Sequence, residues 1–470
     1  MKVLFINIPK YNVIDANGIE KTSKSIGYYP PLGLLSLATY LKDNSEHEVV
    51  VFDTILEDSN PEDIKQKIVE EKPDIVAITV YTPCLVDLIT LLKIIESLDK
   101  NITVCLGGPH TDLYTKESLN YPGVDYVIRG EGEYAFKEIV DKLSKNEKVD
   151  GVNGISFLNE KKEVVSVGLP NFIENIDELP IIDMTLVPFK KYNSILGTEG
   201  MTATIATSRG CPFRCTFCSA KKLGKYRMRS IDNVVREVEK CIALGYKDFF
   251  LFDDLFNITD ERVRSFCEEL LKREIKIKWH FRGRVNNLSF KTLRLAKETG
   301  LQTIMFGIER GTDEDLRLLK KDINVEQIKE TIRITNKLKI KSGGNFMIGI
   351  PGDTKEKIEQ LSKFICDLGL DYAQVGILIP YPYTDIYKEG LEKGIIKTDF
   401  WQRFAENPSK DFMPEVWTEN LTREELSEAV RKIWRKFYFR PGYVLKSVLS
   451  VRSMADIKNK VRGLLGVLGM

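Results

Sequence analysis

Short apolar runs rich in β-branched and aromatic residues alternate with helical patterns along most of this 470-residue chain. Strands that are apolar throughout and separated by helices indicate parallel sheets covered on both faces. A chain of this length also exceeds what one hydrophobic core usually supports, so two or three domains are expected. The alternation therefore predicts an α/β protein with more than one parallel sheet.

Residues 1–150 hold a first series of strands and helices. The expected strands are Val3–Ile8, Val49–Asp53, Asp74–Val80, Ile102–Leu106 and Asp125–Ile128, and the expected helices are Leu32–Lys42, Pro61–Glu71, Leu85–Leu98 and Tyr134–Leu143. This series predicts an N-terminal doubly wound, Rossmann-like sheet, which binds ligands beyond the carboxyl ends of its strands. A hairpin is expected over Gly154–Val167, followed by the Pro/Asp-rich stretch Asp177–Asp183, and we interpret residues 151–200 as a linker.

A second series of strands begins after Thr202. These strands are expected at Thr204–Thr207, Asp248–Phe252, Lys276–Arg282, Thr303–Gly307, Ser342–Ile348 and Gln374–Ile379. Their number and the helical patterns between them predict a partial (β/α) TIM-type barrel over residues 201–390. The alternation then fades, and residues 391–470 are expected to form a mostly helical, basic C-terminal extension.

Three cysteines, Cys211, Cys215 and Cys218, stand in a C-x3-C-x2-C spacing just after the first strand of the second series. Thiolates are the soft ligands that iron–sulfur clusters require. Three of them can hold three irons of a [4Fe–4S] cubane and leave the fourth iron open to a small molecule. Structural zinc is the alternative, but zinc needs a fourth ligand, and neither a second cysteine pair nor a nearby histidine supplies one. The spacing therefore predicts a [4Fe–4S] cluster.

This segment resembles the signature of the radical SAM superfamily, and the resemblance extends over about residues 200–390. It implies that the open iron binds the amino and carboxylate groups of S-adenosylmethionine (SAM). One electron, from a donor of the flavodoxin or ferredoxin type, would then break a sulfur–carbon bond and yield a 5′-deoxyadenosyl radical. Phe217 matches the aromatic position that packs near the adenine.

The same resemblance assigns cofactor contacts to other strand ends. Asp253 and Asp254 would hold the methionyl amine, Arg284 the carboxylate, Glu309 the ribose, and the turn from Gly349 to Gly352 would approach the adenine. Ordinary loop chemistry is the alternative for each residue. Catalytic groups concentrate on the carboxyl face of such barrels, which favours a functional role.

The N-terminal region lacks the G-x-G-x-x-G fingerprint of dinucleotide-binding sheets after its first strand. Its glycines fall instead at Gly107 and Gly108, before Pro109 and His110, and at Gly130, beside Glu131 and Glu133. Glycine there allows a ligand to approach the backbone closely. The two glutamates could accept hydrogen bonds from hydroxyl or amide groups of that ligand.

These glycine segments, together with Pro30-Pro-Leu-Gly-Leu34, resemble the cobalamin-binding domain attached to many radical SAM enzymes. The D-x-H-x-x-G motif, which supplies an axial histidine in other B12 proteins, is absent. The resemblance implies a bound cobalamin with its own base displaced, and Tyr81 and Thr82 are the nearest candidates for the lower face of the cobalt. For His110 we favour a locally hydrogen-bonded turn histidine over a cobalt ligand.

Bulk composition restricts partners and location. The net charge of +1 gives no electrostatic reason to expect nucleic acid. No apolar run approaches the roughly 20 residues that cross a bilayer, and no signal-peptide cleavage site is evident. The clustered cysteines indicate a reducing compartment. We therefore expect a cytoplasmic protein. Residues 431–470 carry ten Lys/Arg against one acid. A solvated helical face is the ordinary explanation, and peripheral contact with anionic lipid is the alternative.

Over nearly the whole chain, the order of these features resembles cobalamin-dependent radical SAM methyltransferases, including hopanoid methylases. The resemblance implies methylation of an unactivated carbon in a hydrophobic small molecule, such as a lipid or tetrapyrrole. Radical cyclisation or oxidation without methyl transfer, as in the anaerobic magnesium-protoporphyrin monomethyl ester cyclase, is one alternative. A cobalamin-binding sensor or carrier is the other.

Overall fold

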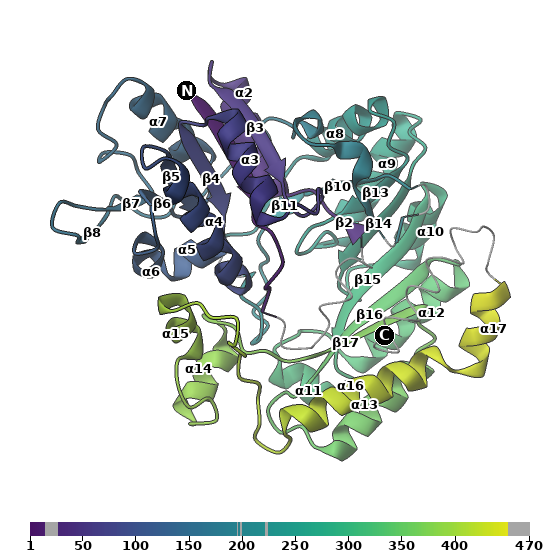
Figure 1. Cartoon of the computed structure of the whole chain (residues 1–470). Coiled ribbons are helices and arrows are strands. Elements are labelled where there is room, and N and C mark those ends of the chain that lie inside the picture. The colour runs from purple at the N-terminus through teal and green to yellow at the C-terminus, as the bar shows by residue number, and fades with distance from the viewer. Residues whose placement is uncertain (15–26, 195, 198–199, 221–223, 450–470) are drawn as a thin grey trace. The chain divides into compact units, whose positions relative to one another are not determined.

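The computed structural model describes residues 1–14, 27–194, 196–197, 200–220 and 224–449 (Figure 1). These residues divide into two compact units, which we describe separately. Unit 1 contains residues 1–14, 28–192 and 399–413, and unit 2 contains most of 193–398 together with 414–449. In this part of the chain no helix is both long and apolar enough to cross a bilayer.

In the described part of unit 1, seven strands form one sheet in the order β3-β1-β4-β5-β6-β7-β8. The strands are β1 (Lys2–Asn7), β3 (Glu48–Asp53), β4 (Ile75–Thr79), β5 (Thr103–Gly107), β6 (Tyr126–Ile128), β7 (Ile155–Leu158) and β8 (Val164–Ser166). The first five are parallel, and β7 and β8 are added antiparallel. The interior of β1 is fully buried, as a sheet covered on both faces requires.

The helices of unit 1 pack in pairs that match a doubly wound sheet. They are α2 (Leu32–Asp43), α3 (Pro61–Glu71), η2 (Thr82–Cys84), α4 (Leu85–Leu98), α5 (Pro109–Leu113), α6 (Thr115–Leu119), α7 (Glu133–Ser144), η3 (Ile176–Glu178), η4 (Met184–Leu186), η5 (Phe189–Lys191) and α15 (Phe400–Glu406). Helix α2 contacts α7, and α3 contacts α4. The chain runs from β1 outward to β3 and then returns past β1 to β4, so the strand order reverses between β1 and β4. Sheets of this kind bind ligands at such a reversal.

The hairpin predicted over Gly154–Val167 is present as β7 and β8, but it extends the first sheet. Residues 151–192 therefore belong to unit 1 rather than forming a linker. Two side chains show why. Tyr192 is fully buried and donates a 2.7 Å hydrogen bond to Asp53 at the end of β3, and Thr39 of α2 accepts from the backbone of Asp183 at 3.0 Å. Neither long-range partner was evident from local sequence.

In the described part of unit 2, six parallel strands follow one another in chain order, as a partial barrel requires. They are β10 (Thr202–Ile205), β13 (Asp248–Leu251), β14 (Lys278–Gly283), β15 (Leu301–Glu309), β16 (Lys341–Ile348) and β17 (Tyr372–Ile377). Short strands β11 (Ser208–Arg209) and β12 (Arg227–Met228) pair with each other beyond β10, and β2 (Gly27–Tyr28) and β9 (Asn193–Ser194) are two-residue strands.

Each helix between the barrel strands begins at a side chain that caps it. The helices are α8 (Ile231–Ala243), α9 (Asp260–Lys272), α10 (Phe290–Glu298), α11 (Asp313–Leu318), α12 (Val325–Lys337) and α13 (Lys355–Asp367). Their caps, in the same order, are Ser230, Thr259, Ser289, Thr312, Asn324 and Thr354, each accepting a backbone N–H of the first turn. Such caps satisfy donors that the helix itself leaves unpaired, and they fix where each loop ends.

The basic, aromatic segment near the C-terminus is largely packed against the barrel. After α14 (Asp385–Glu392), helix α16 (Arg423–Tyr438) lies along β17 and α13, and α17 (Pro441–Leu449) follows it (Figure 1). Phe437 is fully buried, the Tyr438 hydroxyl bonds both backbone groups of Ala373, and Arg440 stacks on Phe437 at 4.0 Å. The alternation of aromatic and basic residues thus reflects internal packing. Residues 450–470 lie outside the described part.

Two phenylalanines on this segment, one buried and one exposed, allow the packing of α16 to be tested. Phe437 is 0% exposed and Phe439 is 46% exposed. We expect Phe437→Ala to lower the free energy of unfolding by about 3–5 kcal/mol, because it leaves a cavity between α16 and the sheet. Phe439→Ala should change it by less than about 0.5 kcal/mol. Urea unfolding of the full chain by circular dichroism measures both. Equal effects would contradict this packing of α16.

Candidate functional site

The three predicted cluster ligands lie on one loop, between β11 and β12, at the carboxyl end of the barrel. Cys211 and Cys215 are half-buried and Cys218 is exposed. Burial of the thiol groups raises the pKa of Cys211 and Cys218, even though the Cys218 residue as a whole is exposed, and the charges of Asp254 and of the neighbouring thiols add to this. Among the described residues, no three His, Cys, Asp or Glu side chains surround a point that could hold a single metal ion. A set of three thiols suits a cluster with an open iron.

Asp253 anchors the root of this loop. Its carboxylate accepts hydrogen bonds from the Thr207 backbone N–H at 2.5 Å, the Thr207 hydroxyl at 2.5 Å and the Ser208 N–H at 3.2 Å. Arg262 donates to the Thr207 carbonyl at 3.0 Å from the other side. These bonds explain why β10 ends at Ile205, two residues before the predicted end. Asp253 is buried and its carboxylate is used within the chain, so it positions the cysteine loop, whereas the exposed Asp254 beside it faces the thiols.

Arg284, in the loop after β14, lies against the cysteine loop. Its guanidinium carbon is 3.8 Å from the centre of the Phe213 ring, and Nη1 is 4.0 Å from the Cys215 sulfur. Nη2 donates to the Lys321 carbonyl, and the backbone N–H and C=O of Arg284 both bond the side-chain amide of Asn257. A buried, rigidly held cation therefore stands beside the cysteines, where it can pair with a carboxylate.

Phe217 forms the apolar side of the site. It packs against a buried cluster that contains Leu319, Ile350 and Trp417. The backbone of the preceding Thr216 bonds the Leu319 carbonyl at 3.0 Å and the Ile386 N–H at 3.1 Å, so the ring is held between α11 and α14. Ile350 belongs to the turn from Gly349 to Gly352, so the structure brings together the two features predicted to contact adenine.

Glu309, at the end of β15, has a buried partner that sequence reasoning missed. Lys321 Nζ lies 2.9 Å from Glu309 Oε1, and both side chains are about nine-tenths buried. The same ammonium is 5.8 Å from the centre of the Phe217 ring. A Cβ at Gly307 would lie 2.8 Å from Glu309 and 2.9 Å from Lys321, so this glycine makes room for the pair. Nothing in the local sequence around Lys321 marks it.

The turn from Gly349 to Gly352 is held by a second buried network. Both glycines have positive φ, and Asp353 accepts from the N–H groups of Gly349 at 2.7 Å and Ile350 at 3.2 Å. Arg310, which is 1% exposed, donates to both oxygens of Asp353, at 3.1 and 2.6 Å. Arg310 and Asp353 are further residues that sequence reasoning missed, because their partners are about forty positions apart.

The barrel residues together fit SAM joined to a cluster. The thiols and Arg284 provide the charged end, Phe217 and Ile350 the apolar end, and Glu309 with Lys321 the polar groups between them. This order matches an amino acid attached through sulfur to a nucleoside. The fit rests on the chemistry of these donors.

In unit 1, His110 is engaged within the fold. It is fully buried, with Nδ1 3.1 Å from the Thr82 hydroxyl and Nε2 3.3 Å from the Tyr121 hydroxyl. Burial lowers the pKa of His110 to about 3. The ring therefore supports Thr82 and is not offered to a ligand, in agreement with a locally bonded turn histidine. Tyr81, at the end of β4, is 54% exposed.

Three of the predicted ligand contacts in unit 1 have partners within the chain. Glu131 accepts from the Ile173 N–H at 2.6 Å, and Glu133 accepts from the Ser36 hydroxyl at 2.6 Å. A Cβ at Gly130 would lie 2.3 Å from the Asn171 carbonyl oxygen. These residues hold the segment after β8 and helix α2, and a ligand contact at them stays a prediction.

Three other glycines in unit 1 differ in whether the fold itself requires a residue without a side chain. Gly108 has φ +102° and approaches Val80, so the fold itself requires it. A Cβ at Gly107 would make only ordinary contacts with Ile128, and one at Gly33 would meet no heavy atom of the described residues within 4 Å. The fold does not explain these two glycines, and an open backbone surface at β5 and at the start of α2 fits a bulky ligand such as a corrinoid.

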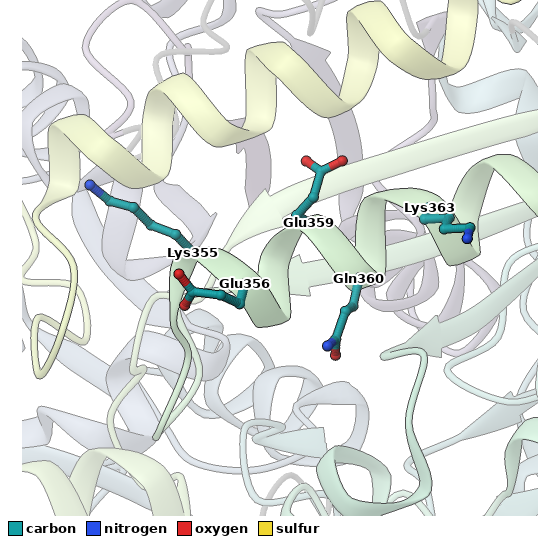
Figure 2. A pocket seen from close by; sticks show the side chains of 5 residues that line it. All are labelled: Lys355, Glu356, Glu359, Gln360 and Lys363. Atoms are coloured by element: carbon teal, nitrogen blue, oxygen red, sulfur yellow. The ribbon is translucent and has the colours of Figure 1, made fainter.

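A hollow of about 470 Å³ lies elsewhere, along one helix. Its lining residues are Lys355, Glu356, Glu359, Gln360 and Lys363, all on α13 (Figure 2). Lys355 pairs with Glu425 at 2.7 Å and Glu359 with Lys436 at 2.5 Å, so two of these charges connect α13 to α16. The side chains diverge, with Lys355 and Glu359 toward α16 and Gln360 away from it (Figure 2). This surface does not gather groups around a ligand.

The anchoring role of Asp253 can be separated from that of Asp254. We expect Asp253→Ala to lower the amount of iron bound after anaerobic reconstitution by at least about half. The substitution removes the acceptor of three hydrogen bonds at the root of the cysteine loop, and each buried donor left without a partner destabilises the folded loop by about 1–3 kcal/mol. Asp254→Ala should keep its iron. Iron per chain and the visible spectrum measure this. Normal iron in Asp253→Ala would contradict the anchor.

The buried His110 predicts a pH effect on stability. Its folded pKa lies below that of the unfolded chain, so the unfolded state binds the extra proton and stability is lost as pH falls below about 6.5 toward 3. We expect the wild type to lose about 1.4 kcal/mol per pH unit more than His110→Gln between pH 6 and pH 5. Urea unfolding at both pH values gives the difference. Parallel slopes would show that His110 titrates normally.

Comparison with known proteins agrees with this division of the chain. The B12 binding domain model matches residues 22–140, and the radical SAM superfamily model matches residues 205–365. An uncharacterized methyltransferase of Pyrococcus horikoshii is 33% identical over 472 residues, which cover 99% of this chain and 98% of that protein. The anaerobic magnesium-protoporphyrin IX monomethyl ester cyclase of Rubrivivax gelatinosus is 28% identical over 94% of this chain and 78% of its own length.

A solved structure shares the fold. The radical SAM methyltransferase TsrM from Kitasatospora setae, with cobalamin and a [4Fe–4S] cluster bound, superimposes with a TM-score of 0.73 and 18% identity, covering 94% of this chain and 89% of TsrM. Two domain models in sequence order and a relative one-third identical along its whole length lead to one conclusion. The chain belongs to the radical SAM superfamily, as a methyltransferase-like enzyme that carries a B12-binding domain.

Proposed function

We propose that this enzyme transfers a methyl group from SAM, by way of cobalamin, to an unactivated carbon of a hydrophobic small molecule. The observation that carries the proposal is one chain with two sheets, matched by the B12 binding domain and radical SAM models, of which the second has three thiols and Arg284 at its carboxyl end. The cluster and SAM would supply a carbon-centred radical oxidant, and the corrinoid would supply the methyl group. An acceptor carbon then needs neither a lone pair nor an acidic proton.

Different residues of the barrel would bind the cluster and the separate parts of SAM. Cys211, Cys215 and Cys218 would hold the cluster, and Arg284 would pair with the carboxylate of SAM. Phe217 and the turn from Gly349 to Gly352 would enclose the adenine, and Glu309 would contact the ribose while Lys321 holds its carboxylate in place. Asp253 would act only through the cysteine loop.

Exposed aromatic side chains support a hydrophobic substrate. Tyr381 and Tyr383 follow β17 at the carboxyl end of the barrel, and they are 37% and 50% exposed. Aromatic side chains that stay partly exposed beside a site offer apolar contacts to a substrate. The cyclase relative is named for a tetrapyrrole ester, magnesium-protoporphyrin IX monomethyl ester.

Radical cyclisation or oxidation without methyl transfer is a second candidate. The similarity to the cyclase extends over 94% of this chain, so it includes both units and not only the cysteine loop. The two reactions would use the same barrel residues and differ in whether the methyl group of SAM reaches the product.

Two partners would complete the reaction. An electron donor of the flavodoxin or ferredoxin type would reduce the cluster at the exposed Cys218 side of the loop. Peripheral membrane contact would depend on the basic residues after position 449, because Phe437 and Tyr438 before them are packed against the barrel. Vesicle sedimentation of the full chain, with and without residues 450–470, tests that contact.

The radical reaction can be tested before the substrate is known. We expect the anaerobically reconstituted, reduced wild type to cleave SAM to 5′-deoxyadenosine, and the triple variant Cys211→Ala, Cys215→Ala, Cys218→Ala to release none above background. Cys366→Ala, at a partly buried cysteine outside the loop, is the matched control and should cleave normally. Metal analysis should give four irons for each cobalt. Equal cleavage by the triple variant would rule out the radical mechanism.

Methyl transfer is tested with SAM labelled in its methyl group. Reduced enzyme loaded with cobalamin is incubated with lipid and tetrapyrrole extracts, and products are separated by chromatography and mass spectrometry. Label in a new product supports the methyltransferase. A new product without label favours the cyclase-type reaction and overturns the proposal.

A further inference from the structure

A chain of buried hydrogen bonds begins at the carboxyl end of β4 in unit 1. The Thr82 hydroxyl lies 3.1 Å from His110 Nδ1, and His110 Nε2 lies 3.3 Å from the Tyr121 hydroxyl. Tyr121 in turn donates to the Ala405 carbonyl oxygen at 2.7 Å. The side chains of this relay are all buried. Ala405 lies in the last turn of α15, where helix carbonyls have no partner in their own helix.

The direction of each bond follows from its last member. A carbonyl oxygen can only accept, so the single proton of the Tyr121 hydroxyl is committed to Ala405. The Tyr121 oxygen must then accept from His110, which requires that His110 carry its proton on Nε2. Because burial keeps the ring neutral, Nδ1 has a lone pair and no proton. The Thr82 hydroxyl must therefore donate to Nδ1.

This direction determines what Thr82 can offer a ligand. Its only proton points into the fold, so the remaining lone pairs make it an acceptor and not a donor. Thr82 follows β4 beside the reversal between β1 and β4, where doubly wound sheets bind ligands. The loops after β1 and β4 meet there, through Asn12 with Asp87 at 2.6 Å and Ile14 with Pro83 at 3.0 Å.

We propose that Thr82, oriented by the His110–Tyr121–Ala405 relay, is a hydrogen-bond acceptor for an O–H or N–H donor of the bound corrinoid. This inference deepens the proposed function, since it rests on cobalamin binding to unit 1. The donor has two sources in a cobalamin whose own base is displaced: a water on the lower face of the cobalt, or an acetamide of the corrin ring. The relay makes His110 a positioning residue that acts through Thr82.

Two substitutions at Thr82 test the acceptor on the full-length protein with cob(II)alamin as the probe. Thr82→Val keeps the shape but removes the oxygen, and we expect its affinity for cob(II)alamin to fall about three- to tenfold, as for one lost hydrogen bond. Thr82→Ser keeps the oxygen and should bind as the wild type does. Thermal unfolding of both variants checks that unit 1 is intact.

Electron paramagnetic resonance of the bound cob(II)alamin separates the two sources. If Thr82 holds a water on the cobalt, the Val variant changes the axial hyperfine pattern as well as the affinity. If Thr82 accepts from a corrin acetamide, affinity falls and the cobalt spectrum is unchanged. Wild-type affinity together with a wild-type spectrum in Thr82→Val overturns the inference.

The relay has a readout that needs no cobalamin. The chain contains only three histidines, so nitrogen-15 labelling of histidine gives three ring systems, and the one lost in His110→Gln is assigned to His110. We expect that ring to be neutral with its proton on Nε2. A proton on Nδ1 overturns the relay and the acceptor role with it. A wild type that binds no cobalamin, with the expected tautomer, instead rejects the proposed function and the ligand named here.

Discussion

The candidate site depends on one buried carboxylate, Asp253, which accepts three hydrogen bonds from Thr207 and Ser208 at the root of the cysteine loop. A loop of this length would otherwise move freely at the edge of the barrel, and its thiols would not keep one spacing. Burial raises the pKa of Asp253, and the donors from Thr207 and Ser208, together with the charge of Arg262, act in the opposite sense. The end of β13 thereby holds the chain that leaves β10.

The same arrangement recurs around the carboxyl face of the barrel. Arg310 holds Asp353, which shapes the turn at Gly349, and Lys321, whose ammonium is near the Phe217 ring, holds Glu309. Buried ion pairs of this kind contribute little net stability, because desolvation offsets their attraction. Their effect here is to fix the orientation of groups at the carboxyl face of the barrel. A radical reaction benefits from such rigid placement, since the reactive carbon must meet one substrate atom and no other.

Unit 1 uses its buried polar groups in a comparable way. Glu131, Glu133 and Gly130 hold the segments that cover the sheet, and the relay from Ala405 to Thr82 sets the direction of one hydroxyl. Glu131 and Glu133, which the sequence predicts to face a ligand, each have a hydrogen-bond partner within the chain. Residues that contact a ligand and residues that anchor the fold can be of the same type and can both lie near strand ends. Only their neighbours in three dimensions distinguish the two roles.

Local sequence determined the two parallel sheets, most element boundaries to within two residues, and the cysteine loop with its chemistry. Hydrophobic periodicity and ligand spacing act over a few residues, so they can be read without a structure. Tertiary structure alone decided that Asp253 anchors while Asp254 faces the thiols, that residues 151–192 complete the first sheet, and that Lys321, Arg310 and Asp353 support the site. Each of these depends on partners brought together by the fold, and a buried charge or hydroxyl takes its role from the partner that satisfies it.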